Sequence, residues 1–114
     1  MHVVVRRKED VVIVDLDGRL VGGIGDEILR NVVNELLAED WKKILLNLSG
    51  ISAIDSAGIG ELVASLKTAQ HLGASLRILN LHERVRAALH VGRLLPLFEV
   101  FGEELLALKS FEAS

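Results

Sequence analysis

The sequence predicts an α/β fold of one domain, with a mixed sheet of four to five strands and about four helices. Short apolar or β-branched runs alternate with amphipathic helical patterns, and the first two runs are separated only by a short polar turn. Strands joined by a tight turn run antiparallel, whereas strands joined by a helix run parallel. The 114 residues, half of them apolar, suffice for one domain with its own core.

The amino-terminal half is predicted to contain a hairpin, a helix and a buried strand. Runs at 2–7 and 11–16 flank the turn Lys8-Glu9-Asp10 and indicate two antiparallel strands. Residues 17–19 and 22–25 break this pattern, and Asp26 is the expected cap of the next helix. The strand at 44–48 lacks polar alternation, which predicts that it is central or covered on both faces. The helix before it has apolar residues at helical spacing, which are Ile28, Leu29, Val32, Val33, Leu36 and Leu37.

The carboxyl-terminal half continues the alternation. A strand at 76–81, a short helix at 83–90, a short strand at 98–101 and a helix at 103–111 follow a long helix at about 57–72. In that long helix, residues 59, 62, 63, 66 and 69 are expected to face inward. The residues expected to face outward are Glu61, Ser65, Lys67, Thr68 and His71.

The loops at 18–25, 49–55 and 82–83 follow the predicted carboxyl ends of strands. In open α/β sheets such loops gather along one edge, where ligands and partners bind. The loop that holds Gly22 and Gly23 is therefore predicted to share a surface with Ser56.

Composition argues against several classes of function. The chain has no cysteine and no carboxylate–histidine cluster with metal-site spacing, so no metal or other cofactor is expected. Its net charge is −3, its basic residues are scattered and only 4% of its residues are aromatic, which disfavours nucleic-acid binding. Without a signal-like start or a membrane-length apolar run, a cytoplasmic protein that does not enter a membrane is expected.

Residues 54–60 read Ile-Asp-Ser-Ala-Gly-Ile-Gly and lie where the strand at 44–48 gives way to the long helix. This position puts the hydroxyl of Ser56 at a helix N-terminus, among backbone N–H groups that favour negative charge. A serine presented in this way can be reached by another protein and can carry a phosphate. Asp and Ser are also good N-caps, so capping alone could account for both residues. Capping leaves Gly58 and Gly60 unexplained, because glycine weakens a helix, and they suggest close approach or tight packing.

Catalytic chemistry is poorly supported by the sequence. A nucleophile elbow reads Gly-x-Ser-x-Gly, but Ile54 occupies its first position. No sequence motif supplies a general base, so a histidine such as His82 could serve only if the fold happened to bring it next to Ser56. The run Gly23-Ile24-Gly25 begins like a dinucleotide fingerprint but lacks the third glycine. A non-enzymatic protein is therefore predicted.

These residues resemble the STAS domain family, and within it the bacterial anti-sigma-factor antagonists. The match is carried by Leu45-Leu46-Asn47-Leu48 followed by residues 54–60, with support from 12–18 and 76–80. It covers essentially the whole chain, 1–114, in the order and length of its elements, and implies one STAS domain.

The resemblance implies a partner that is both an anti-sigma factor and a serine kinase. The unphosphorylated antagonist would bind this kinase and free the sigma factor, phosphorylation would stop the binding, and a phosphatase would reverse it. Carried over to this sequence, Ser56 is the phosphoacceptor. The residues that shape its presentation are Asp55, Ala57, Gly58, Ile59 and Gly60, and the loop residues Gly22, Gly23 and Ile24 belong to the partner surface.

The sequence departs from the family at two positions. Family members often have an acidic residue in the loop that here reads Val21-Gly22-Gly23-Ile24, and often a second serine where Ala57 stands. Two other functions stay open: a STAS scaffold or accessory subunit of a stress-sensing or lipid-transport complex, without phosphorylation, and a small serine hydrolase that uses Ser56. A weak homodimer is also left open.

Overall fold

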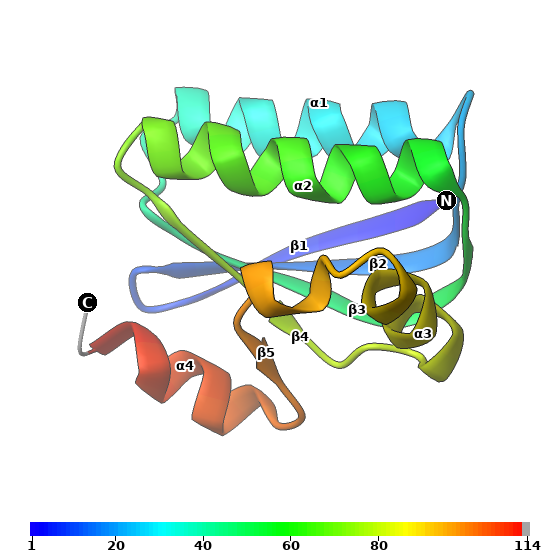
Figure 1. Cartoon of the computed structure of the whole chain (residues 1–114). Helices are drawn as coiled ribbons and strands as arrows, with labels where there is room; N and C mark the ends of the chain where they lie inside the picture. The colour runs from blue at the N-terminus through cyan, green and yellow to red at the C-terminus, as the bar shows by residue number, and fades with distance from the viewer. Residues whose placement is uncertain (113–114) are drawn as a thin grey trace.

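The computed structural model describes residues 1–112 and has an α/β fold built on one mixed sheet (Figure 1). The strands lie in the order β1 (His2–Lys8), β2 (Val11–Leu20), β3 (Lys43–Ile54), β4 (Ser75–Leu79) and β5 (Val100–Phe101). β1 and β2 are antiparallel, and β2 to β5 pair in parallel. The predicted mixed sheet and its N-terminal hairpin are confirmed. The predicted end of the domain at residue 114 lies outside the described residues.

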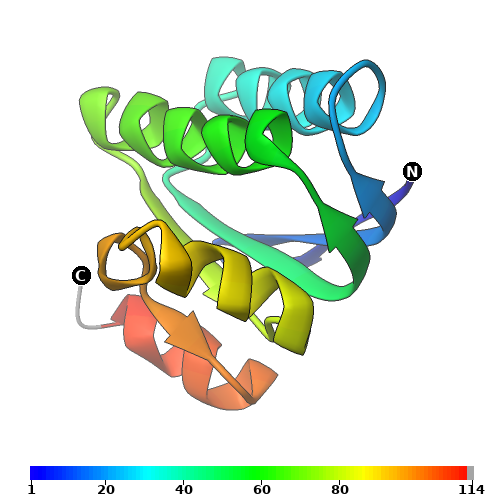
Figure 2. The same ribbon diagram turned by 45° about the vertical axis from the view of Figure 1, so that its right-hand side comes forward.

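Helices cover both faces of the sheet, as Figures 1 and 2 show. α1 (Gly25–Ala38), α2 (Ser56–His71) and α3 (Glu83–Val91) enclose the larger core with one face. α4 (Glu104–Glu112) covers a smaller cluster on the other face, where Phe111 packs with Ile13 and Leu45. A short 3₁₀ turn, Leu95–Leu97, joins α3 to β5. β3 is therefore buried on both faces, as its sequence predicts. Within residues 1–112, no helix is both long and apolar enough to span a membrane.

β2 and β3 are longer than predicted, because residues 17–20 and 49–54 continue as strand rather than loop. Arg19 pairs with Ala53 and Leu20 with Ile54, after register shifts between Asp15 and Asp17 and between Gly18 and Arg19. These irregularities let glycine and polar residues remain in a paired strand. The extension carries the chain directly from β3 into α2.

The structure corrects two predictions about helices. Asp26 is not the cap of α1, because Ile24 occupies the N-cap and Asp26 lies inside the first turn. In α2, Glu61 and Ser65 were predicted to face outward, yet they are only 8% and 3% exposed. Glu61 faces α1, where its carboxylate accepts from Arg30 Nε at 2.8 Å. This pair helps to hold α1 beside α2.

The other elements differ from prediction only at their ends. β4 stops at Leu79 rather than at residue 81, since Asn80 adopts a left-handed conformation with φ of 57°. α3, β5 and α4 lie within one or two residues of their predicted bounds.

A cation bridges the sheet to α4. Arg6 on β1 donates from Nε to Asp15 Oδ2 at 2.7 Å and from Nη1 to Glu104 Oε2 at 3.1 Å. The Arg6 guanidinium lowers the pKa of Asp15 and that of Glu104, mainly through these hydrogen bonds. Both carboxylates favour the folded state more when ionised than when protonated.

Acid is therefore expected to weaken the attachment of α4. Because both folded-state pKa values are depressed, the stabilisation is present above the ordinary values of 3.8 and 4.5 and is lost as the pH falls below them. We expect Glu104→Gln to lower the melting temperature at neutral pH and to make its decline on acidification shallower. Melting curves recorded from pH 7 to pH 3 test this. A decline as steep in the variant as in the unaltered chain would contradict the role of this bridge.

Candidate functional site

Ser56 is the first residue of α2 and is exposed. Asp55 precedes it as the N-cap, with extended backbone angles of φ −118° and ψ −174°. The hydroxyl therefore belongs to the first turn of the helix, where backbone N–H groups lack intrahelical partners and the helix dipole is positive. In Figure 2 the end of β3 and the start of α2 lie beside the link from β2 to α1.

The Asp55 carboxylate bridges two segments that are far apart in the sequence. Its Oδ1 accepts from the Gly58 N–H at 2.9 Å, and its Oδ2 accepts from the Gly22 N–H at 3.0 Å. These amide donors, with that of Gly22 the largest influence, lower the pKa of Asp55. The ionised carboxylate thus caps α2 and anchors the loop before α1 in one arrangement.

Gly58 allows α2 to approach β2 very closely. A Cβ added to Gly58 would lie 2.0 Å from the carbonyl oxygen of Leu20, a distance that no side chain tolerates. The same carbonyl oxygen accepts from the Asp55 N–H at 3.4 Å. Gly58 is buried, so it does not lie on the surface itself; it helps to position Ser56 by letting the first turn of α2 pack against β2. The predicted close approach is confirmed at this glycine.

The loop between β2 and α1 lies directly against the start of α2. A Cβ added to Gly22 would lie 3.0 Å from the Cβ of Ala57, so loop and helix are in contact. Gly23 adopts φ of 102° and donates its N–H to Asp26 Oδ1 at 3.0 Å, which turns the loop back toward α1. Ile24 follows with 67% of its surface exposed. The prediction that this loop and Ser56 share a surface is confirmed.

Gly60 lies one turn further along α2 and differs from Gly58. It is exposed, and among the described residues a Cβ added there would meet nothing within 4 Å. Ile59 between them is half buried and packs against the larger core. We use the term Ser56 surface for the exposed residues Gly22, Gly23, Ile24, Asp55, Ser56, Ala57 and Gly60. It consists of small side chains with one large apolar residue, and its charge comes from Asp55.

The histidine named above as a possible base lies at the start of another helix. His82 caps α3, with its Nδ1 accepting from the Arg84 N–H at 3.3 Å. In the described part of the chain, no group of three or more histidine, aspartate or glutamate side chains is placed to hold a metal ion.

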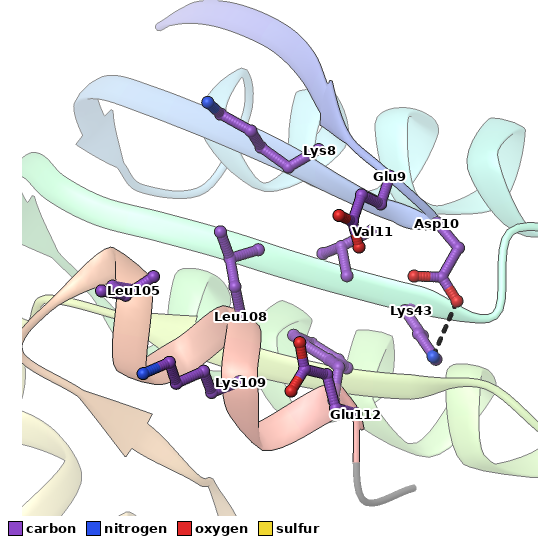
Figure 3. A pocket seen from close by; sticks show the side chains of 10 residues that line it. Lys8, Glu9, Asp10, Val11, Lys43, Leu105, Leu108, Lys109 and Glu112 are labelled. Carbon is purple, nitrogen blue, oxygen red and sulfur yellow. Dashed lines mark hydrogen bonds and ion pairs between the residues drawn. The ribbon is translucent and has the colours of Figure 1, made fainter.

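A separate groove lies between α4 and the turn of the β1–β2 hairpin, and sequence reasoning did not foresee it (Figure 3). It encloses about 300 Å³ over an apolar floor that includes Val11, Leu108 and Phe111. Lys43 and Asp10 are paired at its rim at 2.7 Å. Lys43 begins β3 whereas Ser56 follows its end, so the groove lies at the opposite end of the sheet from the Ser56 surface. Its rim residues are Lys8, Glu9, Asp10, Lys43, Lys109 and Glu112, whose formal charges balance.

The sequence model of the STAS domain matches residues 2–106. A Thermotoga neapolitana protein that carries the name anti-sigma factor antagonist TM1081 homolog is 31% identical over 77 residues, which span 65% of this chain and 68% of that protein.

Two solved structures have the same fold. The crystal structure of TM1081 from Thermotoga maritima, described as an anti-sigma factor antagonist, has a TM-score of 0.86 at 24% identity and covers 95% of this chain and 92% of its own. The Bacillus cell fate determinant SpoIIAA in its phosphorylated form has a TM-score of 0.72 at 18% identity, and covers 96% of this chain and 99% of its own.

The two glycines of α2 are expected to respond oppositely to alanine. Gly58→Ala places a methyl group against the Leu20 carbonyl and should destabilise the fold by about 3 kcal/mol, near the upper end for overpacking. Gly60→Ala meets open space and should stabilise the fold by up to about 1 kcal/mol through helix propensity. Urea unfolding of the matched pair measures both effects. Equal destabilisation of the two variants would show that the close contact with β2 is not what requires Gly58.

Proposed function

The chain belongs to the STAS domain family, and on that premise we propose that it is an anti-sigma factor antagonist controlled by phosphorylation of Ser56. The unphosphorylated Ser56 surface binds an anti-sigma factor that is also a serine kinase, and this binding frees the sigma factor. The observation that carries the proposal is the exposed serine at the start of α2, flanked by an exposed loop and anchored by Asp55. The names of TM1081 and its homolog support the same assignment.

The composition of the Ser56 surface suits a protein partner. Small residues at Gly22, Ala57 and Gly60 allow another backbone to come close, and the exposed Ile24 offers an apolar anchor at its border. A kinase must bring its active centre within bonding distance of the serine hydroxyl, which a bulky rim would prevent. The small side chains around Ser56 therefore suit both partner binding and phosphoryl transfer.

Phosphorylation would change this surface through charge. A phosphate adds about −1.5 to −2 charge beside Asp55, whose own pKa is depressed and which is therefore ionised at neutral pH. Covering such a group with a partner that offers no cation carries a large desolvation penalty. The partner would leave, and a phosphoserine phosphatase would restore the binding form. This is a switch of the interface, with the same backbone in both states.

A catalytic use of Ser56 has less support. A nucleophilic serine requires a base within hydrogen-bond reach. The Nδ1 of His82 accepts from the Arg84 N–H of its own helix, and among the described residues no hydrogen bond joins His82 to Ser56. The function assigned to the site is therefore binding.

Phosphorylation at Ser56 is tested with each anti-sigma factor kinase encoded in the same genome. Incubation with one of these kinases and ATP should add a single phosphate, detected by intact mass. Ser56→Ala should abolish the addition, while Ser52→Ala serves as the matched control because Ser52 is also exposed and lies close by at the end of β3. The charge mechanism further predicts that Ser56→Asp weakens binding about tenfold or more without changing the melting temperature. Phosphate on the Ser56→Ala variant, or full affinity in Ser56→Asp, would refute the proposal.

Ile24 and Gly60 are expected to contribute to partner affinity without supporting the fold. Ile24→Lys should weaken kinase binding, because it replaces an exposed apolar anchor with a hydrated charge. Gly60→Ala should weaken binding while stabilising the isolated protein, since its methyl group fills space left for the partner. Val91→Lys is the control, since Val91 is 82% exposed and lies at the end of α3. Titration calorimetry and melting curves on the same samples separate the two effects. Undiminished affinity in both variants would place the interface elsewhere.

A further inference from the structure

The two edges of the sheet are unequal. β5 forms one edge with only two residues, whereas β1 forms the other with seven. Among the described residues, β1 pairs with β2 alone. A long edge strand presents a row of backbone N–H and C=O groups that can pair with another strand.

The first half of β1 has little protection against such pairing. Its sequence, His-Val-Val-Val, contains no proline and no Lys or Arg. Val4 and Val5 are 45% and 52% exposed. They lie on opposite faces, because Val5 pairs with Val14 of the larger core and Val4 pairs with Asp15 on the α4 face. The next residue, Arg6, is held by Asp15 and Glu104, so its charge is directed onto the α4 face and away from the strand edge.

We propose that β1 pairs antiparallel with β1 of a second copy of this chain, around a two-fold axis perpendicular to the sheet. Such an axis keeps equivalent faces of the two sheets on the same side. Because side chains alternate between faces along a strand, an odd-numbered residue must then lie opposite an odd-numbered one, and an even-numbered residue opposite an even-numbered one. The register that follows places Val4 opposite Val4, and Val3 opposite Val5, of the two copies. The sheet then continues from one copy into the other.

The distribution of charge along β1 favours pairing with a second copy of the chain in this register. In the antiparallel arrangement, Arg7 and Lys8 of the two copies lie at opposite ends of the interface. Arg7 lies opposite Met1 and Lys8 lies beyond the paired residues, so neither faces a Lys or Arg side chain of the other copy. Arg6 faces His2, and its charge is already compensated by Asp15 and Glu104. A register centred on Val5 would instead place Arg6 and Arg7 opposite valines, and a parallel pairing would place the basic ends together.

The dimer is expected to be weak. In this register only His2 to Arg6 of each β1 lie opposite one another, and strands this short bury less than the roughly 1,200 Å² typical of stable interfaces. It should therefore form in a concentration-dependent manner. The inference uses no residue of the Ser56 surface and stands apart from the proposed function.

Sedimentation velocity over a range of protein concentrations tests the association. The unaltered chain should move reversibly from monomer toward dimer as its concentration rises. Val4→Lys places like charges opposite each other at the two-fold axis and should weaken association about tenfold or more. Val91→Lys adds the same charge at another exposed valine and should have no effect. A monomer at every concentration, including millimolar, or equal association of both variants, would overturn the proposal.

Crosslinking tests the register and does not depend on how well Val4→Lys folds. The chain has no cysteine, so Val4→Cys introduces a single thiol. Opposed residues of antiparallel strands have Cα atoms about 4.5–5.5 Å apart, which lies within the range of Cα separations that a disulfide spans. Mild oxidation should convert Val4→Cys to a covalent dimer faster than Val91→Cys. Equal rates of crosslinking in the two variants would exclude the Val4-centred pair. If the chain did not associate with itself but bound an added acidic peptide at β1, the edge would belong to a different partner.

Discussion

The structure depends on the contact between the first turn of α2 and the carbonyl of Leu20. Gly58 allows this approach because any Cβ there would collide with the Leu20 oxygen. The Asp55 carboxylate then binds amides on both sides of the contact, at Gly22 and at Gly58. Together they fix the start of α2, the end of β2 and the loop before α1 as one unit. Ser56 is held at the surface of this unit with its backbone already constrained.

The sequence predicts the order of the elements well, because the hydrophobic pattern is a local property. The helical spacing of Leu29, Val33 and Leu36 marks α1, and all three are buried as expected. The position of Ser56 also follows from local signals, namely an apolar strand, a capping aspartate and a helical pattern. The proximity of the Gly22 loop to Ser56, through contacts with Asp55 and Ala57, follows from topology, since parallel strands bring their carboxyl ends together.

The parts that the sequence does not reveal depend on partners far along the chain. The helical pattern predicts that Glu61 faces solvent, because the pattern does not reveal that Arg30 of α1 lies opposite it and donates to its carboxylate. The continuation of β2 through Gly18 depends on pairing with β3, which no local propensity reports. The groove beside α4 is lined by residues of the β1–β2 turn and of α4, which lie far apart in the sequence, so no contiguous sequence motif predicts it. Gly58 and Gly60 look alike in sequence, and only the neighbouring backbone tells them apart.

Rigidity at the start of α2 favours a switch that acts through the surface. A refolding of this region would have to separate Gly58 from Leu20 and break both hydrogen bonds of Asp55. A phosphate at the first position of a helix interacts favourably with the dipole by only about 0.3–1 kcal/mol, and Asp55 beside it opposes the added charge. Neither influence is large enough to pull a packed helix from its sheet, where separation of buried contacts typically requires several kcal/mol. The proposed phosphorylation therefore changes what a partner meets, namely a hydrated anion in place of a hydroxyl, and leaves the scaffold that presents it in place.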